Sequence, residues 1–206
     1  MRTILMITVD FELQPGYHFI LKSMRHPSFF FTGLTLGTLA VPIPLVAHAE
    51  IYLTEEQACS VIFPGPSMTF KPLMLDLNPQ EISTIESRSH ETVRHPKLKL
   101  WLGPKNEVVL IDQVLGKHEF ITFALGITSE GAIKQVEILE YRETYGSQVR
   151  KAEWRSQFTG KTTHAPLKLN EDIKNLSGAT LSSAHVTAGV RRLLFTYDVI
   201  HAKIKK

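Results

Sequence analysis

Cysteine is almost absent from this chain of 206 residues, because Cys59 is the only one. A single cysteine cannot close an intrachain disulfide, and the sequence has no Cys-x-x-Cys, Cys-x-x-Cys-His or paired-histidine spacing. These absences argue against haem, iron–sulfur and structural zinc sites, so no metal site is expected. Ala58, Val61 and Ile62 surround Cys59, and we therefore expect a small buried side chain rather than a reactive thiol.

The chain also lacks a strong excess of one charge. It has 23 Lys and Arg against 20 Asp and Glu, and the basic residues are spread along the sequence rather than clustered. This pattern argues against a nucleic-acid partner. A Gly-x-Gly-x-x-Gly fingerprint for NAD(P)H and a Gly-x-Ser-x-Gly nucleophile elbow are both absent, so neither a stand-alone reductase nor a hydrolase is indicated, and no catalytic residue is predicted.

One long uncharged run lies near the N-terminus, at residues 27–46. Lys22 and Arg25 precede it and Ala47-His48-Ala49 follows it, which is the order of a basic segment, an apolar segment and a small-x-small cleavage site. We predict a signal peptide over residues 1–49, cut after Ala49, and a periplasmic or other extracytoplasmic location. Met24 would give this signal a conventional start.

The same run approaches the length of a membrane-spanning helix. Pro42 and Pro44 would interrupt the last turns of such a helix, which favours cleavage over retention. If the segment is retained, the protein is membrane-anchored.

Residues 50–206 are expected to form a single α+β domain. Two segments have the pattern of a helix start. Thr54-Glu55-Glu56-Gln57 begins a helix that runs through Ile62, and Asn78-Pro79-Gln80-Glu81 begins a second helix. Four β-rich runs with short connections then predict an antiparallel meander of about four strands with flanking helices: Lys97–Leu102, Val108–Leu115, Phe120–Ile127 and Ile133–Tyr141. Ser147 is expected to cap a helix through Phe158. A final amphipathic helix should pack on the sheet through Val186, Val190, Leu193, Leu194 and Tyr197.

Small and hydroxyl-bearing residues gather where this last helix begins, in Ser177-Gly178-Ala179-Thr180-Leu181-Ser182-Ser183. Free backbone N–H groups and the positive end of the helix dipole point into such a turn, so it can bind a phosphate group. On composition alone, an ordinary helix cap with surplus serines explains the segment as well.

Ser177-Gly178-Ala179-Thr180 resembles the flavinylation motif of FMN-binding domains, such as those in the C subunit of the sodium-pumping NADH:quinone reductase and the G subunit of the Rnf complex. In that family the final threonine carries FMN through a phosphoester bond, transferred from FAD by a magnesium-dependent flavin transferase. The resemblance therefore implies covalent FMN on Thr180, with Ser177, Gly178, Ala179, Leu181 and Ser182 around it.

Two further segments are similar to the same family. Glu143-Thr144-Tyr145-Gly146 looks like its Glu-Thr-Pro-Gly segment, with Tyr145 in place of proline. Trp154, Phe158, Gly160 and Lys161 are similar to the Trp-x-x-x-Phe-x-Gly-Lys stretch of exported members. Tyr145, Trp154 and Phe158 are candidates to flank the flavin ring, and Lys161 or the backbone near Gly146 is a candidate to stabilise negative charge on the reduced flavin. Core packing of the aromatic residues and a surface position for Lys161 are the alternatives.

One position departs from the family pattern. The family usually has an acidic residue three positions before the motif serine, where this chain has Lys174; the nearest acid is Asp172. The sequence thus leaves two hypotheses. The first is an exported electron carrier with FMN on Thr180, which exchanges electrons with a membrane or haem protein. The second is a binding or regulatory module on the same fold without the cofactor.

Overall fold

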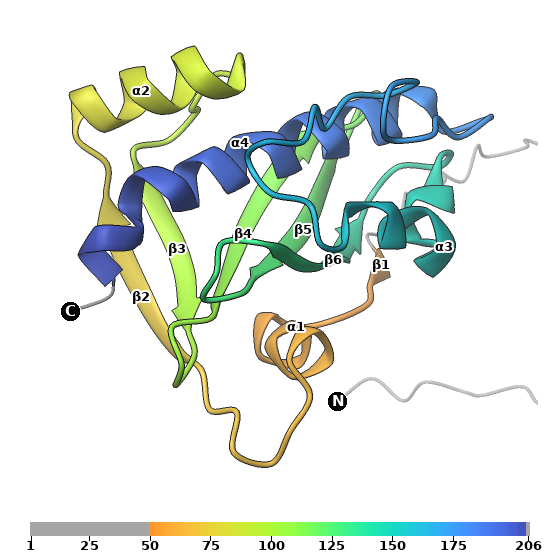
Figure 1. Cartoon of the computed structure of the whole chain (residues 1–206). Helices are drawn as coiled ribbons and strands as arrows, with labels where there is room; N and C mark the ends of the chain where they lie inside the picture. The colour runs from red at the N-terminus through yellow and green to blue at the C-terminus, as the bar shows by residue number, and fades with distance from the viewer. Residues whose placement is uncertain (1–49, 205–206) are drawn as a thin grey trace, which may run out of the picture. The chain divides into compact units, whose positions relative to one another are not determined.

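The computed structural model describes residues 50–204, and their centre is one antiparallel sheet of six strands (Figure 1). The strands lie in the order β1-β6-β5-β4-β3-β2. Their bounds are Glu50–Ile51 for β1, Lys71–Asp76 for β2, Lys97–Leu102 for β3, Val108–Leu115 for β4, Phe120–Ile127 for β5 and Ile133–Tyr141 for β6. The α+β class predicted from the sequence is confirmed.

The four strands predicted from the sequence are β3 to β6, and they form a meander. Each run is rich in β-branched and aromatic residues, and each connection is too short for anything but an antiparallel hairpin. The ladder between β4 and β5 is continuous from Val108↔Ile127 to Leu115↔Phe120. The prediction of a four-strand meander is therefore correct in its centre and incomplete at both edges.

The two edge strands were not predicted because their sequences carry weak strand signals. β2 contains Pro72, which cannot donate a ladder hydrogen bond and is tolerated at a sheet edge. β1 has only two residues, and its pairing with β6 joins Glu50 to Tyr141, 91 positions apart in the chain. A strand pairing between residues so far apart in the sequence cannot be predicted from local periodicity.

Helices cover the sheet on both faces (Figure 1). The long helix α4, Thr180–Ile204, and α2, Pro79–Ser89, pack on one face, and α1, Glu55–Ile62, packs on the other. The five residues predicted to face the sheet from the last helix are all buried. Both predicted helix starts are present, and each forms a capping box, at Thr54 and at Asn78. Cys59, a residue of α1, is buried, and burial raises the pKa of its thiol to about 12.

The helix predicted from Ser147 to Phe158 is not continuous, which corrects that prediction. Residues Ser147–Arg150 form a 3-10 turn (η1), Ala152–Arg155 a single α-turn (α3) and Ser156–Phe158 a second 3-10 turn (η2). Lys151 breaks the run, because its φ of −58° and ψ of 125° are not helical. Gly146, at a φ of 95°, precedes the first turn, and no side-chain cap forms there.

The predicted signal peptide, residues 1–49, lies outside the described residues and stays a prediction. Among residues 50–204, no helix combines the length and apolar character needed to cross a bilayer.

Candidate functional site

The hydroxyl-rich segment lies at the N-terminus of α4, as the sequence predicted. The helix begins at Thr180, whose side chain is exposed, while the preceding Ala179 is buried. Gly178 has a φ of 80°, a left-handed conformation that glycine adopts without strain. Ala179 N–H donates to the carbonyl of Leu176 at 3.0 Å and closes the turn before the helix. Thr180 thus stands at the surface on a constrained turn.

The first amides of α4 differ from those of α1 and α2. In α1 and α2 a side chain caps the N-terminus, whereas in the described chain no hydrogen bond to the amides of Thr180, Leu181 or Ser182 is present. The Ser183 hydroxyl does not accept from these amides and instead donates to Asn175 Oδ1 at 2.9 Å. The helix therefore presents free donors and its positive dipole end next to the Thr180 hydroxyl, which is a suitable environment for an anion.

The segment 143–146 lies against this first turn. The Tyr141 hydroxyl donates to the carbonyl of Tyr145 at 2.5 Å and lies 3.1 Å from Ser182 Oγ. A Cβ on Gly146 would stand 2.6 Å from the Tyr141 hydroxyl and 2.7 Å from Ser182 Oγ. The Tyr141 hydroxyl thus links segment 143–146 to the motif at 177–183, although the two segments are 31 or more positions apart in the sequence.

Hydrogen bonding and burial shift two pKa values at this contact. Burial raises the pKa of Tyr141 despite the Ser182 hydrogen bond, and the charge of Glu143 adds to the rise. For Glu143 burial acts in the same direction, but the backbone amides of His118, Glu119 and Lys117 outweigh it and the pKa is lowered. At neutral pH the site therefore holds a neutral tyrosine beside an ionised glutamate that fixes the turn after β4.

Trp154 anchors the loop that leads into the motif. Its indole Nε1 donates to the carbonyl of Lys174 at 2.8 Å, and Lys174 N–H donates to Gln157 Oε1 at 2.8 Å. A hollow of about 310 Å³ lies between this loop and α3, and its lining ends at Leu176, one residue before the motif. This volume is at the lower end of the range of ligand pockets. Trp154 lines it although only 3% of the residue is exposed.

The other two aromatic candidates lie in opposite environments. Phe158 is fully buried and packs edge-on against Trp154, with ring centroids 5.2 Å apart. Its position matches the core-packing alternative that the sequence allowed. Tyr145 is 83% exposed and, with the 47% exposed Leu181, presents apolar surface at the corner that holds Thr180.

Lys161 forms an ion pair with Asp172 at 2.9 Å, with its side chain 22% exposed. Burial alone would raise the pKa of Asp172, but the Lys161 ammonium and the amides of Lys168 and Leu167 lower it overall. The ammonium is thus held by a protein carboxylate, and a role at the flavin ring would compete with this pair. Asp172 itself is held by these partners in the loop before the motif, while Lys174 is exposed.

Sequence reasoning did not single out Gln148, the second residue of η1. A Cβ built on Gly178 lies 3.6 Å from Gln148 Nε2, so this amide lies beside the motif. Its Oε1 atom is buried and has no hydrogen-bond partner within the described residues. No local sequence signal could identify it, because the contact joins positions 30 apart.

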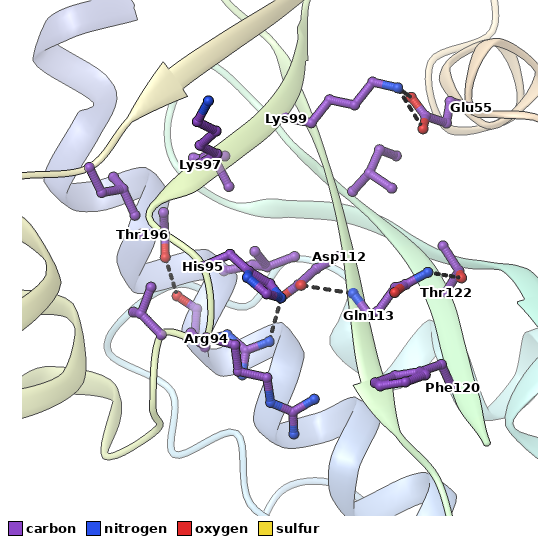
Figure 2. A pocket seen from close by; sticks show the side chains of 16 residues that line it. Glu55, Arg94, His95, Lys97, Lys99, Asp112, Gln113, Phe120, Thr122 and Thr196 are labelled. Atoms are coloured by element: carbon purple, nitrogen blue, oxygen red, sulfur yellow. Dashed lines mark hydrogen bonds and ion pairs between the residues drawn. The ribbon is translucent and has the colours of Figure 1, made fainter.

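A second hollow, of about 330 Å³, lies further along α4 (Figure 2). It opens where β3 and β4 diverge, since their ladder contains only Leu100↔Leu110, Trp101↔Val109 and Leu102↔Val108. Figure 2 shows Lys99 paired with Glu55 and Gln113 bonded to Thr122 at its walls. Arg192 lies twelve residues from Thr180, about 18 Å along the helix axis, so this hollow is separate from the motif.

Residues 116–194 match the model of the FMN-binding domain family. The chain contains an FMN-binding domain. The match runs from the turn after β4 to the middle of α4, so it includes both motifs and all the predicted site residues. The resemblance is confirmed, and the family implies FMN as the cofactor. No curated protein matches the chain.

The residues present fit this cofactor. The uncapped amides of α4 suit its phosphate, and the buried, unpartnered Oε1 of Gln148 offers a hydrogen-bond acceptor close by. The hollow beside Trp154 adds partly apolar surface next to the motif.

Proposed function

We propose that this FMN-binding domain is an exported electron carrier in which FMN is attached through a phosphoester bond to Thr180. The observation that carries the proposal is the position of the Thr180 hydroxyl, which is exposed at an uncapped helix N-terminus inside the FMN-binding domain. The alternative is a module of this fold that works without the cofactor, and the experiment below distinguishes the two.

The attachment is a transfer of the FMN moiety from FAD. The Thr180 oxygen attacks the phosphorus on the FMN side of the phosphoanhydride, a new P–O bond forms, and the bond to AMP breaks. The threonine proton leaves with AMP, and no oxidant or reductant is needed. A magnesium-dependent flavin transferase is the maturation partner, and exposure of Thr180 is the condition for its access.

The chain's own groups then hold the phosphate. A helix N-terminus contributes about 0.3–1 kcal/mol to binding of a negative charge, whereas micromolar retention of a free ligand requires about 8 kcal/mol in total. The covalent bond removes this shortfall, which matters outside the cytoplasm, where a lost cofactor is difficult to replace. Ser177, Gly178 and Ala179 shape the turn, and Ser182 binds Tyr141 and so holds segment 143–146 beside it.

A ring attached at Thr180 has two surfaces within reach. Leu176 and Trp154 line the hollow on one side, and Tyr145 and Leu181 are exposed on the other. Bound FMN supplies one- and two-electron redox chemistry. Because the site is at the surface, electron exchange with a second protein is favoured over catalysis on a small substrate, and we infer a membrane or haem protein as the redox partner.

Export rests on the N-terminal sequence. The uncharged run at 27–46 with its basic flank and Ala47-His48-Ala49 fits a cleaved signal, which would deliver the domain to the periplasm or another extracytoplasmic compartment. Retention of the run would instead tether the same domain to the membrane.

The test is the variant Thr180→Ala, co-expressed with the transferase and compared with the unchanged chain. We expect the unchanged chain to keep flavin absorbance at roughly 450 nm after denaturation and desalting. Thr180→Ala should lose this absorbance, and in the flavin-free form it should melt at the same temperature as the unchanged chain. Thr180→Ser is the matched control, because it retains the hydroxyl. Absence of flavin from the unchanged chain supports the cofactor-free module.

A further inference from the structure

The Gln148 side chain has an unsatisfied polar atom in a place where proteins seldom leave one. Its Oε1 is buried without a hydrogen-bond partner in the described chain. Leaving a buried acceptor unpaired costs free energy, and such atoms in native structures are usually satisfied by a bound water, ion or ligand.

The position of this amide limits what can satisfy it. Nε2 of Gln148 lies 3.6 Å from a Cβ built on Gly178, in the turn that leads to Thr180. Gly146, two residues before Gln148, contacts Ser182 in the first turn of α4. The Gln148 amide therefore lies beside the motif, on the 3-10 turn that follows segment 143–146.

We infer that Gln148 is a cofactor-binding residue, whose amide binds the phosphate and ribityl part of FMN. This inference rests on FMN binding at the proposed site. The amide offers both kinds of group that this part of FMN needs: Nε2 donates to a phosphate oxygen, and Oε1 accepts from a ribityl hydroxyl. An anion alone would satisfy Nε2 and leave Oε1 unpaired, so the amide favours a phosphate that carries a hydroxyl-bearing chain.

The inference makes opposite predictions for the protein without and with flavin. Gln148→Leu removes the unpaired acceptor at similar size, so the flavin-free protein, made in a host without the transferase, should melt about 2–4 °C higher than the unchanged chain. Free FMN titrated into the same protein and followed by flavin fluorescence should bind about tenfold more weakly to the variant, because one or two hydrogen bonds are lost.

A second variant and a control make the test decisive. Gln148→Glu keeps the shape and an acceptor but replaces the donor with a negative charge, so it should weaken FMN binding more than Gln148→Leu does. Gln113→Leu, on an exposed part of β4, controls for a general effect of the substitution and should leave FMN affinity unchanged. If Gln148→Leu does not fold, Gln148→Met serves in its place.

The outcomes separate this inference from the proposed function. If flavin attaches to Thr180 but the Gln148 variants bind free FMN as tightly as the unchanged chain, the inference is overturned and the function stands. If free FMN binds in a Gln148-dependent manner but no covalent flavin forms, the inference stands and the covalent carrier does not. If free FMN does not bind to the unchanged chain, the inference is overturned, and the function is then decided by whether the transferase attaches flavin to Thr180.

Discussion

Gly146 is the residue at which segment 143–146 and helix α4 come closest. Its φ of 95° is strained for other residues, and a Cβ there would also overlap the Tyr141 hydroxyl and Ser182 Oγ, at 2.6 and 2.7 Å. The hydrogen bonds around Tyr141 therefore depend on the absence of one methyl group.

We predict that Gly146→Ala destabilises the protein by about 2–4 kcal/mol, the sum of a backbone penalty and a steric one. Gly160→Ala is the matched control, since Gly160 has a similar φ of 79° but no atom within 4 Å of its Cβ position, and it should cost only about 1–2 kcal/mol. Denaturant unfolding measures both. Equal losses in the two variants would show that the contact with Ser182 and Tyr141 does not contribute.

At the scale of elements, the loop before the motif is held by α3 and η2 rather than by the sheet. Trp154 and Gln157 each bond the backbone of Lys174, and Asn175 Oδ1 accepts from Leu176 N–H and from Ser183. The start of α4 is thereby positioned by a chain of short contacts from residue 154 to residue 183.

We predict that Trp154→Phe loosens this loop while the fold persists, because the ring packing is largely retained and the bond to the Lys174 carbonyl is lost. Hydrogen exchange of amides 174–178 should become about fivefold to tenfold faster, since a lost hydrogen bond is worth about 1 kcal/mol. Exchange in β4 and β5 serves as the internal control. Unchanged exchange in the loop, with the variant folded, would contradict this view of the anchor.

How much of these elements could be predicted depends on the range of the contacts that form them. The central strands β3 to β6, the capping boxes of α1 and α2 and the apolar face of α4 follow from patterns within about ten residues. β1, the break at Lys151 and the position of Gln148 depend on pairing or packing between distant segments, which one sequence does not encode locally. For the candidate site, the resemblance of Ser177–Thr180 to the family motif predicts the place, while only the structure shows that Phe158 is enclosed and that Lys161 is paired with Asp172.

At the scale of the whole molecule, ionised carboxylates bind segments together across the fold. Glu143 accepts from the amides of His118 and Glu119, at 2.5 and 3.1 Å, and joins the turn after β4 to segment 143–146. Its folded pKa lies below the ordinary 4.5, so the folded state binds its proton less readily than the unfolded state. The contribution of ionised Glu143 to the free energy of unfolding is complete above the ordinary pKa. It is lost as the pH falls through the lower pKa of the folded state.

We predict that the melting temperature falls as the pH is lowered from about 6 to about 3, and that Glu143→Gln flattens part of this fall, because glutamine accepts the same bonds without titrating. Glu153→Gln, at an exposed position of α3, should follow the unchanged chain. Thermal melts over this pH series provide the measurement. Parallel curves for Glu143→Gln and the unchanged chain would exclude Glu143 from the acid sensitivity.

We propose that the exposed hydroxyl of Thr180, at the start of α4, carries the cofactor. Intact mass spectrometry of the chain, expressed with and without a flavin transferase, tests it most directly. We expect the transferase to add the mass of one FMN less one water, and peptide fragmentation to place this added mass on Thr180. An unmodified mass from the host with the transferase, or flavin on a residue other than Thr180, would contradict it.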